Sequence, residues 1–78
     1  MKYTGYFIYT RQRPDRAQIK DEWIQSVVVH PIHEKFQSDG RIRRWGKIEE
    51  AGGGILRVIL LEDGEDVHDA FFDRNFKE

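Results

Sequence analysis

Four basic and aromatic residues alternate along one segment of the chain, and their chemistry suits phosphate and a planar ring. They are Arg41, Arg43, Trp45 and Lys47. Side chains two residues apart on a β-strand point to the same face of the sheet, so a strand here places all four on one face. Guanidinium and ammonium groups bind phosphate, and an indole stacks on a nucleobase. The segment therefore predicts a surface that binds RNA or another phosphate ligand.

A second interpretation of the same segment stays open. Lysine and arginine are common on the exposed edges of sheets, where their charge deters edge-to-edge aggregation. A hairpin turn at Asp39-Gly40 also predicts that Phe36 lies opposite Arg43 and adds a second ring to the face. A binding surface and a protected edge are thus both compatible with the pattern.

Two polar residues, Arg57 and His68, interrupt otherwise apolar segments nearer the C-terminus. A buried polar group requires a hydrogen-bond partner or has a functional role. Structural hydrogen bonds and a partly buried functional site are therefore both compatible with these two residues.

No motif predicts a metal or a cofactor. The chain has no cysteine, which excludes disulfides, thiolate metal sites and cysteine nucleophiles. His30 and His33 have a spacing seen in metal sites, but Pro31 prevents the continuous helix that would align them. The triple glycine at 52–54 lacks the helix and the Lys-Ser/Thr pair of a phosphate-binding loop.

The elements that must position these residues are short. Tyr3–Thr10 is rich in β-forming residues and is predicted to be a strand. Ile19, Trp23 and Val27 recur every four residues and predict a helix that ends before Pro31.

Turn signals divide the rest of the chain. Asp39-Gly40, Gly52-Gly53-Gly54 and Asp63-Gly64 separate predicted strands at His33–Gln37, Arg41–Ile48, Ile55–Glu62 and Asp66–Asp73. The fold class is therefore α+β, in one domain spanning residues 1–78: an N-terminal strand, one main helix, and a four-stranded antiparallel meander with the helix packed on one face.

The last hairpin has a predicted register. A two-residue turn at Asp63-Gly64 pairs Leu60 with Val67, Ile59 with His68 and Leu56 with Phe71. Leu56 and Phe71 then share one apolar face, and Ala70 and Phe72 lie on the other. Both faces of this hairpin are apolar, which is typical of strands inside a sheet.

Charge is distributed unevenly between the two parts of the chain. Residues 1–48 carry ten basic and five acidic side chains, and residues 49–78 carry three basic and nine acidic ones. The formal net charge of −1 is therefore a cancellation of +5 and −6. Such asymmetry favours an electrostatic partner, although packing of the two parts against each other also accounts for it.

No apolar run approaches the ~20 residues that cross a bilayer, and no signal peptide is evident, so a cytoplasmic location without a membrane is expected.

Several motifs together resemble a known family. They are Arg16-Ala17-Gln18-Ile19-Lys20-Asp21-Glu22-Trp23-Ile24, Val28-Val29-His30-Pro31, Asp39-Gly40-Arg41, Trp45-Gly46-Lys47-Ile48, Gly53-Gly54-Ile55-Leu56-Arg57-Val58 and Phe72-Asp73-Arg74. Their order and spacing, over about residues 9–74, resemble a family of small, mostly uncharacterised bacterial domains. That family is similar to the BrnT/RelE-like toxin ribonucleases of bacterial toxin–antitoxin systems.

The resemblance implies an RNA-directed, toxin-like domain that binds or cleaves RNA without a metal. Arg41, Arg43, Trp45 and Lys47 would then bind RNA. Proton transfer and charge neutralisation, which metal-independent cleavage requires, would fall to Arg57, His68 and Arg74. The implied partner is an acidic antitoxin-like protein that covers the same surface.

One departure from the family concerns the proposed base. Family members often have a histidine just after the first strand, where this chain has Arg11-Gln12-Arg13.

The alternative function is a non-enzymatic protein-interaction module that binds an acidic partner or forms a homo-oligomer.

Overall fold

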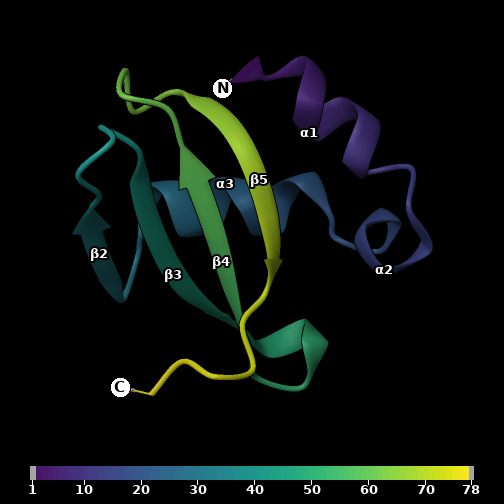
Figure 1. Cartoon of the computed structure of the whole chain (residues 1–78). Helices are drawn as coiled ribbons and strands as arrows, with labels where there is room; N and C mark the ends of the chain where they lie inside the picture. Colours follow the sequence, from purple (N-terminus) through teal and green to yellow (C-terminus); the bar gives the residue numbers. More distant parts are fainter. Residues whose placement is uncertain (1, 78) are drawn as a thin grey trace.

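The computed structural model describes residues 2–77. Its elements are β1 (Lys2–Tyr3), α1 (Gly5–Thr10), α2 (Pro14–Ala17), α3 (Asp21–Val29), β2 (His33–Phe36), β3 (Ile42–Ile48), the 3₁₀ turn η1 (Glu49–Ala51), β4 (Gly54–Leu60) and β5 (Asp66–Phe72). The strands form one five-stranded sheet in the order β1-β5-β4-β3-β2 (Figure 1). The four strands β2 to β5 form the predicted antiparallel meander, and β1 joins its β5 edge in parallel.

Helix α3 packs across one face of the sheet, behind β3 and β4 in Figure 1. Its Ile24 and Val27 are buried against Leu56, Val58 and Leu60, which alternate along β4. The apolar side chains that alternate along β4 thus pack against the apolar face of α3. The α+β fold with the main helix on one face, as predicted, is confirmed.

The ends of α3 follow from local chemistry. Asp21 and Glu22 lie in its first turn, where carboxylates complement the helix dipole. The helix ends at Val29, with His30 as its C-cap, because the residue before Pro31 is disfavoured in helical conformation. No helix within residues 2–77 is long and apolar enough to cross a membrane.

The predicted strand Tyr3–Thr10 is wrong for most of its length, because residues 5–10 form α1. Thr4 caps this helix, since its side-chain oxygen accepts a hydrogen bond from the backbone N–H of Phe7 at 3.2 Å. Phe7 is buried against the core, and this burial outweighs the β propensity of its aromatic neighbours.

A β-bulge in β5 shifts the register of the last hairpin. Leu60 pairs with Val67 as predicted, but Ile59 pairs with Asp69 instead of His68, and Leu56 pairs with Phe72 instead of Phe71. His68 is the extra residue of the bulge. Phe71 therefore points away from α3, whereas Ala70 and Phe72 point toward it.

The hairpin between β2 and β3 also differs by one residue from the prediction. Phe36 pairs with Ile42, and Lys35 takes the place opposite Arg43. The backbone N–H of Gln37 donates to the carbonyl of Arg41, so the loop spans residues 38–40 instead of two residues. Phe36 is consequently an exposed residue on the other side of β2 and does not add a ring next to Arg43.

Candidate nucleic-acid interface

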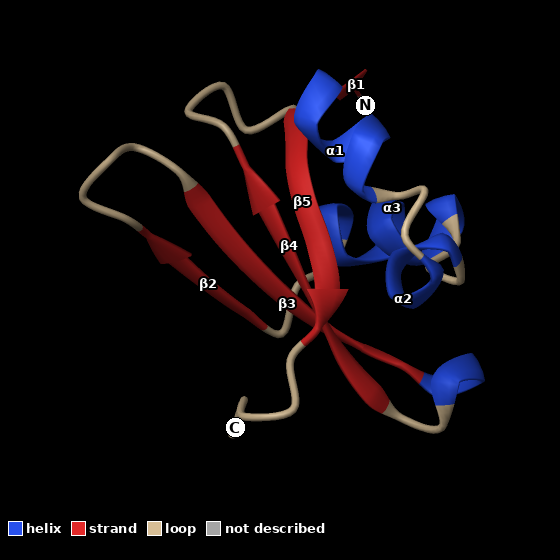
Figure 2. Cartoon of the chain, turned by 45° about the vertical axis from the view of Figure 1, so that its right-hand side comes forward, coloured by secondary structure: helices blue, strands red, loops and turns tan. Residues whose placement is uncertain are grey.

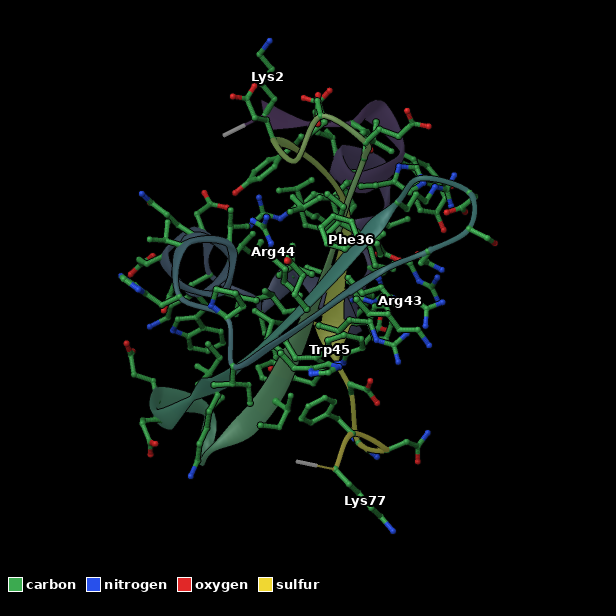
Figure 3. All side chains as sticks on the ribbon, turned by 90° about the vertical axis from the view of Figure 1, so that its left-hand side faces the viewer. Lys2, Phe36, Arg43, Arg44, Trp45 and Lys77 are labelled. Atoms are coloured by element: carbon green, nitrogen blue, oxygen red, sulfur yellow. The ribbon has the colours of Figure 1, made fainter. Side chains whose placement is uncertain are left out.

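The face of the sheet opposite α3, here called the open face, carries the predicted basic segment. Ile42, Gly46 and Ile48 of β3 are buried on the α3 side, so the predicted alternation along this strand is confirmed. Figure 3 shows Arg43 and Trp45 projecting to one side of β3, and Arg44 to the other side, toward α3. In Figures 1 and 2, no helix of residues 2–77 crosses the front of β2, β3 and β4.

Strand register aligns the open-face residues in two neighbouring rows. One row contains His33, Trp45, Arg57 and Phe71, and the next contains Lys35, Arg43, Ile59 and Asp69. The first row therefore alternates aromatic rings with a guanidinium. Arg57 lies 5.5 Å from the centroid of Trp45 and 4.9 Å from that of Phe71. Helix α2 limits this face on the β5 side, where Arg16 pairs with Asp69.

Asp73, the first residue after β5, is hydrogen-bonded to the two middle residues of the aromatic row. Its carboxylate accepts hydrogen bonds from the indole N–H of Trp45 and from Nε of Arg57, both at 3.0 Å. Burial by itself raises the pKa of Asp73, but the hydrogen bonds from Trp45, Arg57 and the Asn75 N–H, with the positive charge of Arg57, outweigh it and hold the pKa below its usual value. Asp73 is therefore a carboxylate at neutral pH.

Phe76 covers the indole of Trp45. The two ring centroids are 5.3 Å apart with an interplanar angle of 27°, and His33 lies 5.2 Å from Trp45 and 5.8 Å from Phe76. Trp45 is only 5% exposed as a result. A nucleobase could stack on this indole, the role predicted for Trp45, only after Phe76 has moved.

A groove of about 420 Å³ lies beside this cluster and is lined by Ile32, His33, Phe76 and Lys77. It combines two ring side chains with an ammonium group at the β2 edge of the open face. Such a lining suits a planar ring that carries negative charge.

Two cations of the second row have no ion-pair partner in the part of the chain that the structure describes. Lys35 and Arg43 are directly opposite each other, and neither forms an ion pair with a residue between 2 and 77. The Nε atom of Arg43 is buried and lacks a hydrogen-bond partner in this part of the chain. Like charges directly opposite each other destabilise a sheet. A bound anion would relieve this repulsion.

Arg41 and Lys47, at the two ends of the basic segment, are exposed and make long ion pairs. Arg41 lies 3.9 Å from Asp39, and Lys47 lies 3.8 Å from Glu49. Exposed pairs of this length contribute little to stability, so both cations remain accessible to a ligand.

The structure separates the three candidate catalytic residues. Arg57 lies in the aromatic row, opposite Phe71. His68 faces the N-terminal segment instead, where its Nδ1 is 3.2 Å from the hydroxyl of Thr4 and its ring stacks on Tyr6 at 4.9 Å. Arg74 is exposed beyond the end of β5. His68, in the bulge, and Arg74, in the turn after β5, thus lie on opposite sides of Phe71 along the chain.

Sequence reasoning missed four contributors to this face: Lys35, Phe71, Asp73 and Phe76. The positions of Lys35 and Phe71 were missed because the register of each hairpin differs from the predicted one. Asp73 and Phe76 follow the last strand, where no periodicity predicts a position. A signal existed in the sequence, since Phe76 is the sole apolar residue after Phe72.

No protein-family model, curated protein or solved structure matches this chain. Among residues 2–77, no group of three or more histidine and carboxylate side chains is arranged to hold a metal ion.

Proposed function

We propose that this protein is a cytoplasmic RNA-binding domain whose open face takes single-stranded RNA. The observation that carries the proposal is the Lys35–Arg43 pair, two cations directly opposite each other without a carboxylate partner among the described residues. Phosphate groups would neutralise both cations and remove their repulsion.

The neighbouring aromatic row favours single-stranded RNA over a simple anion. His33, Trp45 and Phe71 lie one row from the cation pair. The His33 ring is exposed, the Trp45 ring becomes available when Phe76 moves, and the guanidinium groups of Arg16 and Arg57 lie over the Phe71 ring. Neighbouring rows on one face are about 7 Å apart, because alternate residues of a strand share a face. Unpaired bases stack on such rings while cations hold the backbone.

Binding is favoured over cleavage by the positions of the candidate catalytic residues. Metal-independent cleavage requires a base, an acid and a charge-stabilising group around one phosphate. His68 is engaged by Thr4 and Tyr6 at the bulge, and Arg74 lies beyond the C-terminal end of β5. The same surface chemistry also suits an acidic antitoxin-like protein, which the experiment below tests against RNA.

The test is a salt titration of binding to a labelled oligouridine of about 12 nucleotides. Wild-type protein is expected to bind with an affinity that falls steeply as salt rises. Lys35→Ala and Arg43→Ala should each weaken binding and reduce the slope of log affinity against log salt by about 0.7. Arg13→Ala removes an exposed arginine from the α2 end of the molecule and serves as the control, with little change expected.

Two results would overturn the proposal. One is an oligouridine affinity that the Lys35 and Arg43 substitutions leave unchanged. The other is stronger binding of poly-glutamate than of oligouridine at equal charge, which would assign the face to an acidic protein.

A further inference from the structure

The segment from Asp73 to Phe76 presents an anion and a planar ring to the open face. The carboxylate of Asp73 accepts from Trp45 and Arg57, and the ring of Phe76 stacks on Trp45. Figure 1 shows the chain turning after β5 toward the β2 side of the sheet, so the segment reaches the aromatic row from one end.

A nucleotide offers the same two groups. Carboxylates and phosphates both accept charge-assisted hydrogen bonds from a guanidinium, and phenyl rings and nucleobases both stack on an indole. We infer that residues 73–76 occupy the place of one nucleotide, and that RNA reaches Trp45 and Arg57 only when this segment moves away. This inference rests on the proposed RNA-binding function. It adds that residues 73–76 compete with RNA for Trp45 and Arg57.

The attachment of the segment suits reversible release. The backbone N–H of Asp73 donates to the carbonyl of Ile55 at 2.8 Å and continues the sheet to this point. Beyond it, Arg74, Asn75 and Lys77 are exposed, and the Asn75 N–H bonds to the Asp73 side chain, within the segment itself. Release of the segment therefore requires that the Asp73 contacts to Trp45 and Arg57 and the Phe76 stack be broken, and local opening of this kind costs less than global unfolding.

Competition of this kind lowers the apparent affinity for RNA. When only a fraction of molecules has the segment displaced, the apparent dissociation constant is the intrinsic one divided by that fraction. Weakening the segment should therefore tighten RNA binding, the reverse of what the loss of an ordinary binding residue causes.

The experiment compares two segment variants with matched controls in the oligouridine assay. Phe76→Ala uncovers the indole, and Ile8→Ala removes an exposed apolar side chain from α1 as its control. Asp73→Asn removes a charge from the segment, and Asp15→Asn removes the same charge from α2. We expect Phe76→Ala and Asp73→Asn to bind about fivefold tighter than their controls, a change smaller than the loss of one stacked base.

A second measurement follows the segment directly in the wild-type protein. Saturating oligouridine should accelerate amide hydrogen exchange at Asp73, whose N–H group is hydrogen-bonded to the carbonyl of Ile55 in the closed arrangement.

The two hypotheses fail in different ways. RNA binding that depends on Arg43 but is equal or weaker in both segment variants overturns the competitor and leaves the RNA-binding function standing. Amide exchange at Asp73 that is unchanged or slower on RNA addition also overturns the competitor. Binding that ignores Lys35 and Arg43 overturns the function itself.

Discussion

Gly46 of β3 lies directly against Val27 of α3. A Cβ atom at Gly46 would come within 2.7 Å of Cγ2 of Val27, closer than packed carbon atoms approach. The helix therefore sits on the sheet at a distance that only glycine allows. This contact lies directly behind the open face, because Gly46 is the next residue after Trp45.

Gly46→Ala is expected to destabilise the protein by about 1–3 kcal/mol, the usual cost of overpacking a core. Urea unfolding measures this loss. Gly5→Ala is the matched control, since a Cβ there meets no atom within 4 Å and alanine favours the helix that Gly5 begins. A Gly46→Ala variant as stable as wild type would show that α3 can shift without loss of packing.

Lys35→Glu should stabilise the fold while weakening RNA binding. The substitution places opposite charges across β2 and β3 at the position facing Arg43, which contributes roughly 0.2–1 kcal/mol. Urea unfolding and oligouridine binding on the same sample measure both effects. Lys77→Glu makes the same charge change without a cation directly across a strand, so it should leave stability nearly unchanged.

The charge of Asp73 should contribute to stability in a pH-dependent way. Its pKa is lower in the folded chain than in the unfolded chain, so the contribution is present above the unfolded value near 3.9 and is lost as pH falls through the lower, folded value. At pH 7, Asp73→Asn should cost about 1–3 kcal/mol because charge-assisted hydrogen bonds are lost.

Denaturation series from pH 7 down to acid measure this difference between wild type and Asp73→Asn. The two curves should converge below the folded pKa of Asp73. A difference that stays constant with pH would assign the effect to shape instead of charge.

Tyr3 should make the fold sensitive to alkali. Burial first, and then the hydrogen bond to Asp21, raise the pKa of its phenol to about 12. The unfolded chain loses this proton near pH 10, so the contribution of Tyr3 is complete below pH 10 and is lost as pH rises toward 12. Tyr3→Phe should flatten the fall in unfolding free energy over this range, whereas Tyr9→Phe, at a 71% exposed site, should not.

Strands β2 to β5 and the main helix were predictable because their signals are local. Turn residues marked each hairpin, and the alternation along β3 correctly divided Arg43 and Trp45 from Ile42 and Ile48. Proline fixed the end of α3 for a steric reason that does not depend on the rest of the fold.

The elements that the sequence did not reveal depend on contacts between distant residues. Helix α1 forms from β-favouring residues because Thr4 caps it and Phe7 reaches the core. The bulge at His68 is accompanied by contacts to Thr4 and Tyr6, far away in the chain. Strand patterns read without these partners assign Phe71 and Phe72 to the wrong faces.

The candidate site was predictable only in part for the same reason. The basic segment was visible from its period of two, but the Arg43 partner on β2 depended on a loop one residue longer than expected. The burial of Trp45 depends on Phe76, which no strand or helix positions.

The pairing of β1 with β5 also affects how the chain can fold during synthesis. Lys2 and Tyr3 leave the ribosome well before their strand partners, Asp66 and Val67, are made. Closing so long a loop is entropically costly and slows folding compared with local contacts. The N-terminal strand therefore waits for translation of β5, and until then the backbone groups of β1 lack their partners in the sheet.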